Sequence, residues 1–337
     1  MRVVGLVDRI LTMISALLIL LLAQTEPTEV AVRPDPEGEP TQVTASIVVL
    51  DMTDIVDVRQ SFTADVYMKL EWKDARLARD DAAKVRRFGL EQVWNPNIQV
   101  LNENSLTAQL PFVVSVTRDG SVAYMQRFIG TFTIPLHLAH FPFDSHRLPI
   151  SIVAAGYSPD EVQFVAHGQL NGREEQLTLA GWTIDAGRPR IAPYQVHLLD
   201  RTVAGFELEF QIRRVSLFYL LRLIGPLLLI VLIGWGTCWI NPLDTGAQIR
   251  LGATGFLTLV AYQFAVGGLL PKVSYLTRMD MFVAGITLII FCCLGKAVLG
   301  DHLRAKGGED TVVKINRVFR WAYLGAVLVV TTVAFWL

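Results

Sequence analysis

The sequence predicts two structural parts: an immunoglobulin-like β-sandwich over residues 43–214, followed by a bundle of four transmembrane helices over residues 215–337. Short runs of β-branched and aromatic residues, separated by turn signals, fill the first part, a pattern that indicates a sandwich or a barrel and not a parallel sheet. The second part holds four apolar stretches of about 20 residues, the length that crosses a bilayer as a helix. The composition agrees, because 52% of the 337 residues are hydrophobic and the mean hydropathy is +0.41.

The N-terminus has the pattern of an exported chain. Residues 1–23 read as a signal peptide, with Arg2 and Arg9 around a short basic region and an apolar core after it. An uncleaved anchor helix is the alternative, because Leu21 is bulky where cleavage prefers a small residue. Residues 24–42 are rich in Pro, Glu and Asp, which is typical of a mobile leader.

The strands of the sandwich are expected where β-rich runs end at turn signals. Phe206–Ile212 alternates apolar and polar residues with a period of two, which predicts one buried and one wet face. The other clear runs are 43–50, 62–72 and 107–116, and turns are expected at 118–120, 157–160 and 171–172.

Four helices are expected in the second part, at residues 217–240, 249–270, 279–299 and 318–337. Pro226 interrupts the first of them. Basic residues cluster around the connection between the third and fourth helices, a connection of about 15–18 residues. They are Lys296, Arg304, Lys306, Lys314, Arg317 and Arg320. That end is therefore expected in the cytoplasm, which makes the chain a multi-pass protein of the plasma (inner) membrane with its β part in the periplasm or outside the cell.

The second helix differs from the others because it carries polar residues and glycines along an apolar segment. Arg250, Thr254, Leu257, Ala261 and Phe264 share one face at helical spacing. A lipid-facing helix gains nothing from glycines or from polar side chains such as Arg250, Thr254, Thr258 and Gln263, whereas a helix facing water can use them. One helix cannot enclose a pore, so this interpretation requires a closed ring of identical chains. A buried helix of the bundle is the alternative.

Several motifs occur in a fixed order around the block Phe141-Pro142-Phe143-Asp144. They are Trp72–Leu77, Trp94–Asn97, Asp119–Arg127, Ile134–His137, His146–Pro149, Arg214, Leu251–Thr254, Leu257-Thr258 and Leu270–Tyr275. Over roughly residues 43–337 this order resembles the pentameric ligand-gated ion channels, the family of glycine, GABA and nicotinic receptors. Animal members have two cysteines at the positions of Ile134 and Leu148, whereas bacterial and archaeal members lack them, as this chain does. Asn97 replaces the Asp that is usual in the family.

The resemblance implies a homopentamer in which a small molecule or a proton binds between β domains and opens a pore lined by the second helix. Leu257 would form the central hydrophobic ring of that pore. The implied ligand-binding residues are Tyr67, Trp94, Tyr124, Arg127, Tyr157 and Tyr194. Ala155 stands where the family has an aromatic residue, and core packing is the alternative role of Trp94. The implied coupling residues are Phe141, Pro142, Phe143, Asp144, Arg214, Pro271 and Lys272, with Asp144 and Arg214 as a charge pair.

Ion selectivity depends on the inner mouth of the pore. Residues 246–250 contain no acid, where cation-selective relatives have a glutamate ring, so the sequence favours anions. Cation selectivity is the alternative, because Asp244 is close by and five Arg250 side chains would repel one another or extend toward the cytoplasm.

Other function classes have little support in the sequence. It shows no catalytic nucleophile–base pair, metal-ligand cluster or phosphate-binding glycine loop, so neither an enzyme nor a bound metal or cofactor is expected. A membrane-anchored enzyme or a non-channel receptor remains the distant alternative. The net charge of −1 gives no reason to expect nucleic acid. The expected partners are the lipid bilayer, permeating inorganic ions and an unidentified ligand. No disulfide is expected, because Cys238, Cys292 and Cys293 all lie in apolar spans.

Overall fold

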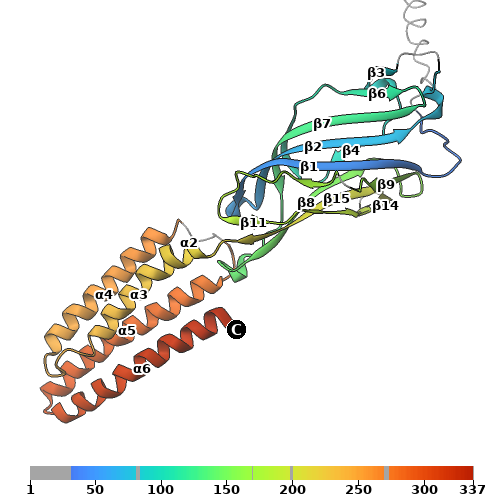
Figure 1. Cartoon of the computed structure of the whole chain (residues 1–337). Coiled ribbons are helices and arrows are strands. Elements are labelled where there is room, and N and C mark those ends of the chain that lie inside the picture. Colours follow the sequence, from blue (N-terminus) through green and yellow to red (C-terminus); the bar gives the residue numbers. More distant parts are fainter. Residues whose placement is uncertain (1–31, 81–83, 169, 198–199, 269–272, 337) are drawn as a thin grey trace, which may run out of the picture.

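The computed structural model describes residues 32–80, 84–168, 170–197, 200–268 and 273–336. A β-rich part and a helical bundle lie end to end, and the helices run away from the sheets (Figure 1). The predicted signal peptide of residues 1–23 lies outside the described residues. Of the predicted leader, residues 32–40 are described and contain no helix or strand, and the first strand begins at Thr41.

The β part consists of short and long strands joined by turns and 3-10 helices. The strands are β1 (Thr41–Val56), β2 (Ser61–Lys73), β3 (Val85–Gly89), β4 (Ile98–Val100), β5 (Glu103–Ala108), β6 (Val113–Thr117), β7 (Ser121–Thr133), β8 (Ser145–Ala154), β9 (Val162–Ala166), β10 (Gly172–Arg173), β11 (Trp182–Ile184), β12 (Arg188–Ile191), β13 (Tyr194–Val196), β14 (Arg201–Val203) and β15 (Gly205–Arg214). The 3-10 helices are η2 (Asp57–Arg59), η3 (Ala75–Leu77), η4 (Leu90–Gln92) and η5 (Leu138–His140).

Two large sheets face each other as a β-sandwich. The first has the order β10-β1-β2-β7-β6-β3, with β9 on β1 and β5 on β7, and the second has the order β11-β15-β8-β4, with β12 on β15. Alternate side chains of β15 fill the space between the two sheets. Phe206, Leu208, Phe210 and Ile212 are buried there, as the period-two pattern predicts, while the intervening residues of the strand are more exposed. A β-sandwich is therefore confirmed as the fold of this part.

The predicted run 107–116 is not one strand. β5 ends at Ala108 and β6 begins at Val113, because Pro111 has no N–H to donate to a ladder. The buried side chain of Gln126 replaces the ladder there: its amide oxygen accepts from the N–H of Leu110 at 2.8 Å, and its amide nitrogen donates to the Leu110 carbonyl at 2.9 Å. A polar side chain thus satisfies the backbone where the strand breaks.

The predicted turn at 118–120 does form, between β6 and β7. Gly120 has φ of +83°, a left-handed conformation, and an added Cβ would lie 2.5 Å from the Asp74 carbonyl oxygen. Glycine is therefore required by both conformation and space.

The helical part has four membrane-length segments. The first is built from α2 (Leu217–Tyr219), a π-helical turn η7 (Leu220–Ile224) and α3 (Gly225–Gly236). The others are α4 (Thr245–Val266), α5 (Arg278–Ala305) and α6 (Glu309–Trp336). All four are long and apolar enough to cross a bilayer. The π turn lies directly before Pro226, whose missing N–H cannot continue a regular helical ladder.

The helix ends differ from those expected from the apolar stretches. The first segment ends at Gly236 and not at 240, and α6 begins at Glu309 and not at 318. Only Lys306–Gly308 separates α5 from α6, so most of the expected 15–18-residue connection is helical. Hydropathy marks the part of a helix that lies in lipid, whereas caps set its ends: the Asp244 side chain accepts from the N–H of Ala247 at 3.0 Å at the start of α4.

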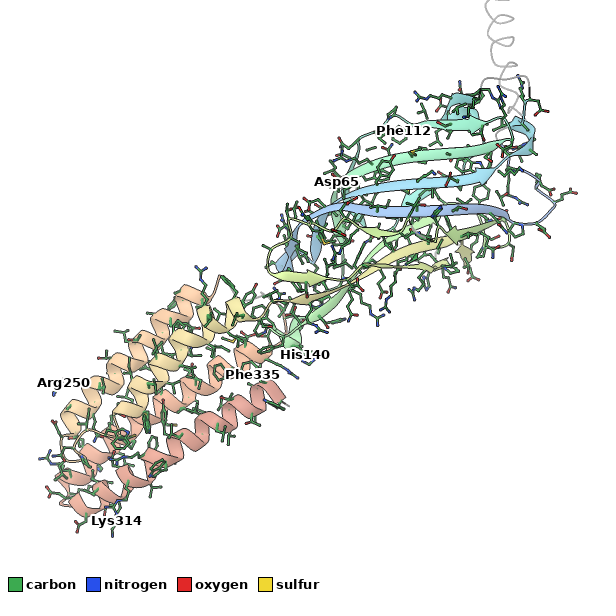
Figure 2. All side chains as sticks on the ribbon, in the orientation of Figure 1. Asp65, Phe112, His140, Arg250, Lys314 and Phe335 are labelled. Atoms are coloured by element: carbon green, nitrogen blue, oxygen red, sulfur yellow. The ribbon has the colours of Figure 1, made fainter. Side chains whose placement is uncertain are left out.

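The basic residues lie where the charge pattern placed them. Arg250 and Lys314 are at the end of the bundle remote from the β part, while His140 and Phe335 are at the junction (Figure 2). One basic residue departs from the expectation: Lys296 is buried inside the bundle, where its ammonium donates to Asn316 Oδ1 at 2.8 Å. The three cysteines are free, with Cys238 and Cys293 buried and Cys292 exposed.

Candidate ligand site, coupling junction and pore face

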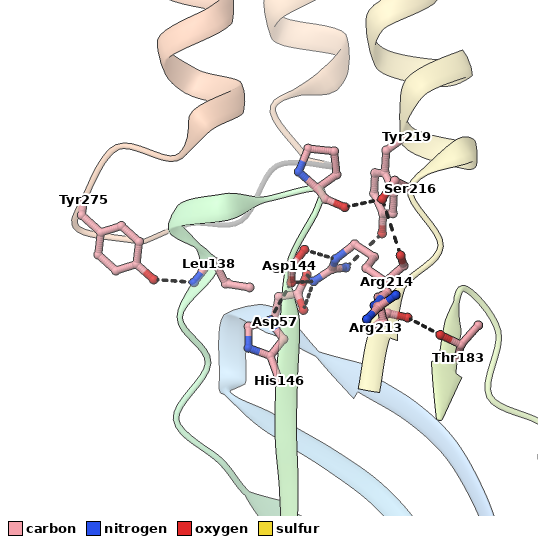
Figure 3. Close-up of polar contacts among 11 residues, drawn as sticks. Asp57, Leu138, Asp144, His146, Thr183, Arg213, Arg214, Ser216, Tyr219 and Tyr275 are labelled. Atoms are coloured by element: carbon pink, nitrogen blue, oxygen red, sulfur yellow. Dashed lines mark hydrogen bonds and ion pairs between the residues drawn. The ribbon is translucent and has the colours of Figure 1, made fainter. Parts of the chain in front are cut away.

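A buried ion pair joins the end of β15 to the loop before β8. The guanidinium of Arg214 donates from Nε to Asp144 Oδ1 at 2.8 Å and from Nη2 to Asp144 Oδ2 at 3.0 Å (Figure 3). The two side chains are 2% and 1% exposed. The charge pair expected from the sequence is therefore present, with the bidentate geometry that gives such pairs their specificity.

Arg214 holds more partners than the sequence indicated. Its Nη2 also donates to both carboxylate oxygens of Asp57, in η2, at 3.0 and 3.1 Å, and its Nη1 donates to the Tyr219 hydroxyl at 3.2 Å. The guanidinium carbon lies 4.1 Å from the centre of the Trp182 ring and 5.0 Å from that of Phe141. One cation therefore connects both sheets to the first helical segment.

The surroundings keep this pair ionised. Burial by itself would raise the pKa of Asp144, but hydrogen bonds from His146 and Arg214 outweigh burial and lower that pKa to about 2. For Arg214, burial acts to lower the pKa, but the hydrogen bonds to Asp144 and Asp57 raise it above its ordinary value. Both groups are consequently charged across the neutral range.

The same loop contacts the helices directly. Ser216 donates from its hydroxyl to the Pro142 carbonyl at 2.8 Å, and the N–H of Leu138 donates to the Tyr275 hydroxyl at 2.8 Å (Figure 3). Phe141 is fully buried within the apolar core of the bundle. The Phe143 ring meets the Phe335 ring edge-on at 5.7 Å, near the end of α6. The loop thus contacts the first helical segment, Tyr275 and the end of α6, while the expected coupling residues Pro271 and Lys272 lie outside the described residues.

Two of the expected ligand-binding residues lie on the outer face of the first sheet. Tyr67 on β2 pairs across the strands with Arg127 on β7. The Tyr67 hydroxyl donates to the sulfur of Met125 at 3.0 Å, and Arg127 Nε donates to Asp65 Oδ1 at 2.9 Å, a contact that raises the pKa of Arg127. This outer face is accessible in a single subunit, and it also carries the exposed apolar side chains of Met125 and Ile129.

Trp94 lies inside the sandwich. Its side chain is 1% exposed, its ring meets the rings of Trp72 and Tyr157 edge-on at 5.9 and 5.8 Å, and its Nε1 donates to the Tyr157 hydroxyl at 2.9 Å. Its ring has no free face in this arrangement, which agrees with the core-packing alternative. Trp94 instead fixes the position of Tyr157, which is only partly buried.

Tyr124 faces the opposite side of its strand from Arg127. It is 6% exposed and lines a cavity of about 170 Å³ with the buried Trp72, the half-buried Asn95 and the exposed Phe112, and burial raises its pKa. Successive side chains of a strand point to alternate faces, and positions 124 and 127 differ by an odd number. The structure therefore separates Tyr124 and Trp94 from Tyr67 and Arg127 within one subunit, although the resemblance had grouped all four.

Tyr194 is the most exposed of the six expected ligand-binding residues. It opens the small β13–β14 hairpin and is 46% exposed. Tyr194, and the partly buried Tyr157, can hence be reached by a partner outside the subunit.

The five expected pore-facing residues all lie on one exposed face of α4. Arg250, Thr254, Leu257, Ala261 and Phe264 are exposed in the single subunit, and Leu257 and Phe264 reach 70% and 83%. The opposite face is packed, with Gly252, Gly255 and Leu259 among its buried residues. The threonine hydroxyls of this region bond to their own helix, since Thr254 donates to the Arg250 carbonyl at 2.9 Å and Thr258 to the Thr254 carbonyl at 2.8 Å.

Several junction residues were not predicted. Asp57, Trp182 and Tyr219 join the Arg214 network from other elements, and His146 bonds Asp144 through Nε2 at 2.6 Å. A signal for His146 did exist, because it lies two positions after Asp144 at the start of β8 and so shares its face. Among the described residues, no group of three or more His, Cys, Asp or Glu side chains could hold a metal ion.

Comparisons with known proteins agree with this geometry. Residues 20–214 match the family model of the neurotransmitter-gated ion-channel ligand binding domain. The chain is 26% identical over 289 residues to a proton-gated ion channel of Gloeobacter violaceus, covering 85% of this chain and 80% of the relative. It is 27% identical over 276 residues to the gamma-aminobutyric acid receptor subunit beta-4 of Gallus gallus, covering 79% of this chain and 56% of that subunit.

These relatives are channels and not enzymes, and the structure adds four helices long enough to cross a membrane. The chain therefore belongs to the pentameric ligand-gated ion channels, as a multi-pass membrane protein with an extracellular β-sandwich domain.

Proposed function

We propose that five copies of this chain form a homomeric channel whose pore is lined by Arg250, Thr254, Leu257, Ala261 and Phe264 of α4. The observation that carries this proposal is the exposed face of α4 in the single subunit. A face that mixes a guanidinium, a hydroxyl and large apolar side chains is costly against lipid, whereas a ring of such helices places it around water.

Leu257 is the gate of this pore. It lies in the middle of α4. Its side chain and that of Phe264 are 70% and 83% exposed in the single subunit, so neither packs closely against the other helices of that subunit. A ring of leucine side chains excludes water from a narrow constriction and so stops ions without a steric seal.

The ligand binds between the β domains of neighbouring subunits. One side of the site is the outer face of the first sheet, with Tyr67 and Arg127, and the other side carries Tyr157 and Tyr194. Trp94 and Tyr124 support the site from inside the sandwich, since both are buried. The ligand is a small molecule or a proton, and one relative of each kind supports these alternatives, a proton-gated channel and a GABA receptor subunit.

Gating follows from a difference in ligand affinity between two states of the junction. A ligand shifts the closed–open equilibrium only by as much as it prefers one state. The loop from Phe141 to Asp144, together with Arg214, carries this shift to the helices, and Pro271 and Lys272 belong to the same coupling region.

Chloride and other anions carry much of the current. Residues 246–250 hold no acid, and Arg250 is exposed at the inner end of α4. Cation selectivity is the second candidate, and one observation favours it: Asp244 is exposed at the same end. Its carboxylate already accepts from the N-terminus of α4, where the helix dipole offsets part of its charge.

Two experiments test the channel proposal. Native mass spectrometry of the detergent-solubilised protein should show five copies, and a stable monomer or tetramer would contradict the proposed ring. Planar-bilayer recording with a panel of amines, amino acids and pH steps should then give unitary currents. Purified pentamer that passes no current under any condition would favour a non-channel receptor.

A further inference from the structure

His146 adds a titratable group to the most buried charge cluster of the junction. Its Nε2 lies 2.6 Å from Asp144 Oδ2, and the two side chains are 5% and 1% exposed. Imidazole is the side chain whose charge ordinarily changes between about pH 5 and pH 8. A histidine at this place therefore exposes the Asp144–Arg214 pair to changes in external pH.

The charged groups around His146 are two carboxylates and one guanidinium. Asp144 precedes β8, Asp57 comes from η2 and Arg214 ends β15, so two carboxylates share one guanidinium and the cluster has a formal charge of −1 while His146 is neutral. Trp182 of β11 supplies only an aromatic ring on this side, 5.9 Å from the imidazole. Protonation of His146 brings the buried cluster to neutrality, which removes an uncompensated charge.

We propose that His146 is a proton-binding site through which external pH regulates gating. When His146 is charged, Asp144 interacts with two cations. The Asp144–Arg214 ion pair then weakens relative to the Asp57–Arg214 ion pair. Arg214 bonds Tyr219 at the start of the first helical segment, so this redistribution reaches the membrane part directly. The inference rests on the proposed coupling role of Arg214, and it concerns regulation by protons whether or not a separate ligand opens the channel.

The lowered pKa of Asp144 supports this arrangement. Because that pKa is about 2, the carboxylate stays ionised over the whole range in which an imidazole titrates. The added proton is therefore expected on His146 and not on Asp144. Acidification changes one group of the cluster, and the carboxylate remains available as its partner.

Tryptophan fluorescence tests whether the proton binds at this place. A protonated imidazole quenches a neighbouring indole, and the Trp182 ring is adjacent to His146. The solubilised oligomer should lose fluorescence on acidification between about pH 8 and pH 5. This component should vanish in His146→Gln, which keeps a hydrogen-bond donor for Asp144 but cannot be charged. It should persist in His140→Gln, a matched change at an exposed histidine of the same loop.

Identical pH profiles of wild type and His146→Gln would overturn the proposal. His146→Asn serves the same purpose if the Gln variant does not assemble. Current recording is the second arm: open probability should differ by about fivefold or more between the two ends of this range, the lower end of usual coupling energies, and the difference should be lost in His146→Gln. An unaltered pH response of the variant contradicts only this inference, whereas the absence of current from every protein contradicts the proposed channel.

Discussion

Arg214 is the residue on which the two parts of the molecule depend most. Its guanidinium is bound by two carboxylates, a tyrosine hydroxyl and the face of a tryptophan, and almost none of it reaches solvent. Taking such charges out of water is costly, and only complete pairing offsets the cost. Each partner is consequently worth more as a member of the network than as an isolated contact.

Removing either member of the pair should leave a buried charge without its partner. Asp144→Asn or Arg214→Gln is each expected to lower the unfolding free energy of the solubilised oligomer by about 3–5 kcal/mol, with strong non-additivity in the double variant. Denaturant or thermal unfolding provides the measurement. The pair Arg147–Glu209, with its 3.6 Å separation and more exposed side chains, joins β8 to β15 and is the control, where about 0–1 kcal/mol is expected. Additive effects at Asp144 and Arg214 would mean that the two do not interact in solution.

The pKa of Asp144 also predicts how stability depends on pH. Its folded value of about 2 lies below the ordinary 3.8, so its contribution is fully present above pH 3.8 and is lost as the pH falls toward 2. Unfolding temperatures followed across this acid range should therefore fall more steeply for wild type than for Asp144→Asn. Parallel curves would show that the carboxylate has no favoured charged state in the fold.

At the residue scale, a contact was predicted where the motifs named both partners, and it was missed where one partner lay in a distant segment without a motif. The pair of Asp144 and Arg214 followed from the resemblance, whereas Asp57 is 157 positions from Arg214 and nothing in its own segment marks it as a partner. The resemblance grouped Tyr124 and Trp94 with Tyr67 and Arg127, although strand alternation places Tyr124 on the core side. The odd difference between positions 124 and 127 already implied that their side chains lie on opposite faces of β7.

At the scale of the element, the sequence predicted the exposed face of α4 well and the residues at which the helix begins and ends less well. Helical spacing assigned Arg250, Leu257 and Phe264 to one side, and this side is the exposed one. The start of the helix at Thr245 depends on a hydrogen bond from Ala247 to Asp244, which hydropathy does not detect. α6 likewise begins with polar residues ahead of its apolar stretch.

The two faces of α4 give a matched test of the gate. Leu257→Thr should hydrate the constriction and raise the open probability without ligand by about tenfold or more, equivalent to about 1.4 kcal/mol. Leu259→Thr makes the same chemical change on the buried face of the helix and should lower stability without opening the pore. Recording both variants beside wild type separates the two effects. If Leu257→Thr gates normally, the constriction lies elsewhere, with Phe264 the next residue to test.

At the scale of the whole molecule, the two-part architecture followed from composition and pattern. Alternating runs predicted a sandwich, and four apolar stretches predicted the bundle. The resemblance placed Asp144 and Arg214 at the contact between the two parts, but it did not name their partners from η2, β11 and the first helical segment. Only the fold brings these elements to one place (Figure 3).

Charge at the inner mouth should decide which ions pass. Ala247→Glu would add one carboxylate per subunit close to the start of α4, and the reversal potential should then move toward that of sodium and potassium. Ion-substitution recording of wild type and variant measures this shift. A wild-type channel that already reverses at the cation potential would contradict the anion proposal, and Asp244→Asn would then identify the selecting charge.

The central claim, that α4 lines the pore, is tested most directly by current block at a single engineered cysteine. Cys292 is exposed, so the background variant is Cys292→Ser. Phe264→Cys and Leu328→Cys replace side chains that are 83% and 67% exposed in one subunit, but α4 and α6 lie on opposite sides of the bundle (Figure 1). A charged, water-soluble thiol reagent should irreversibly reduce the current through Phe264→Cys and leave that through Leu328→Cys unchanged. Block of Leu328→Cys, or an unaffected current through Phe264→Cys, would contradict the claim.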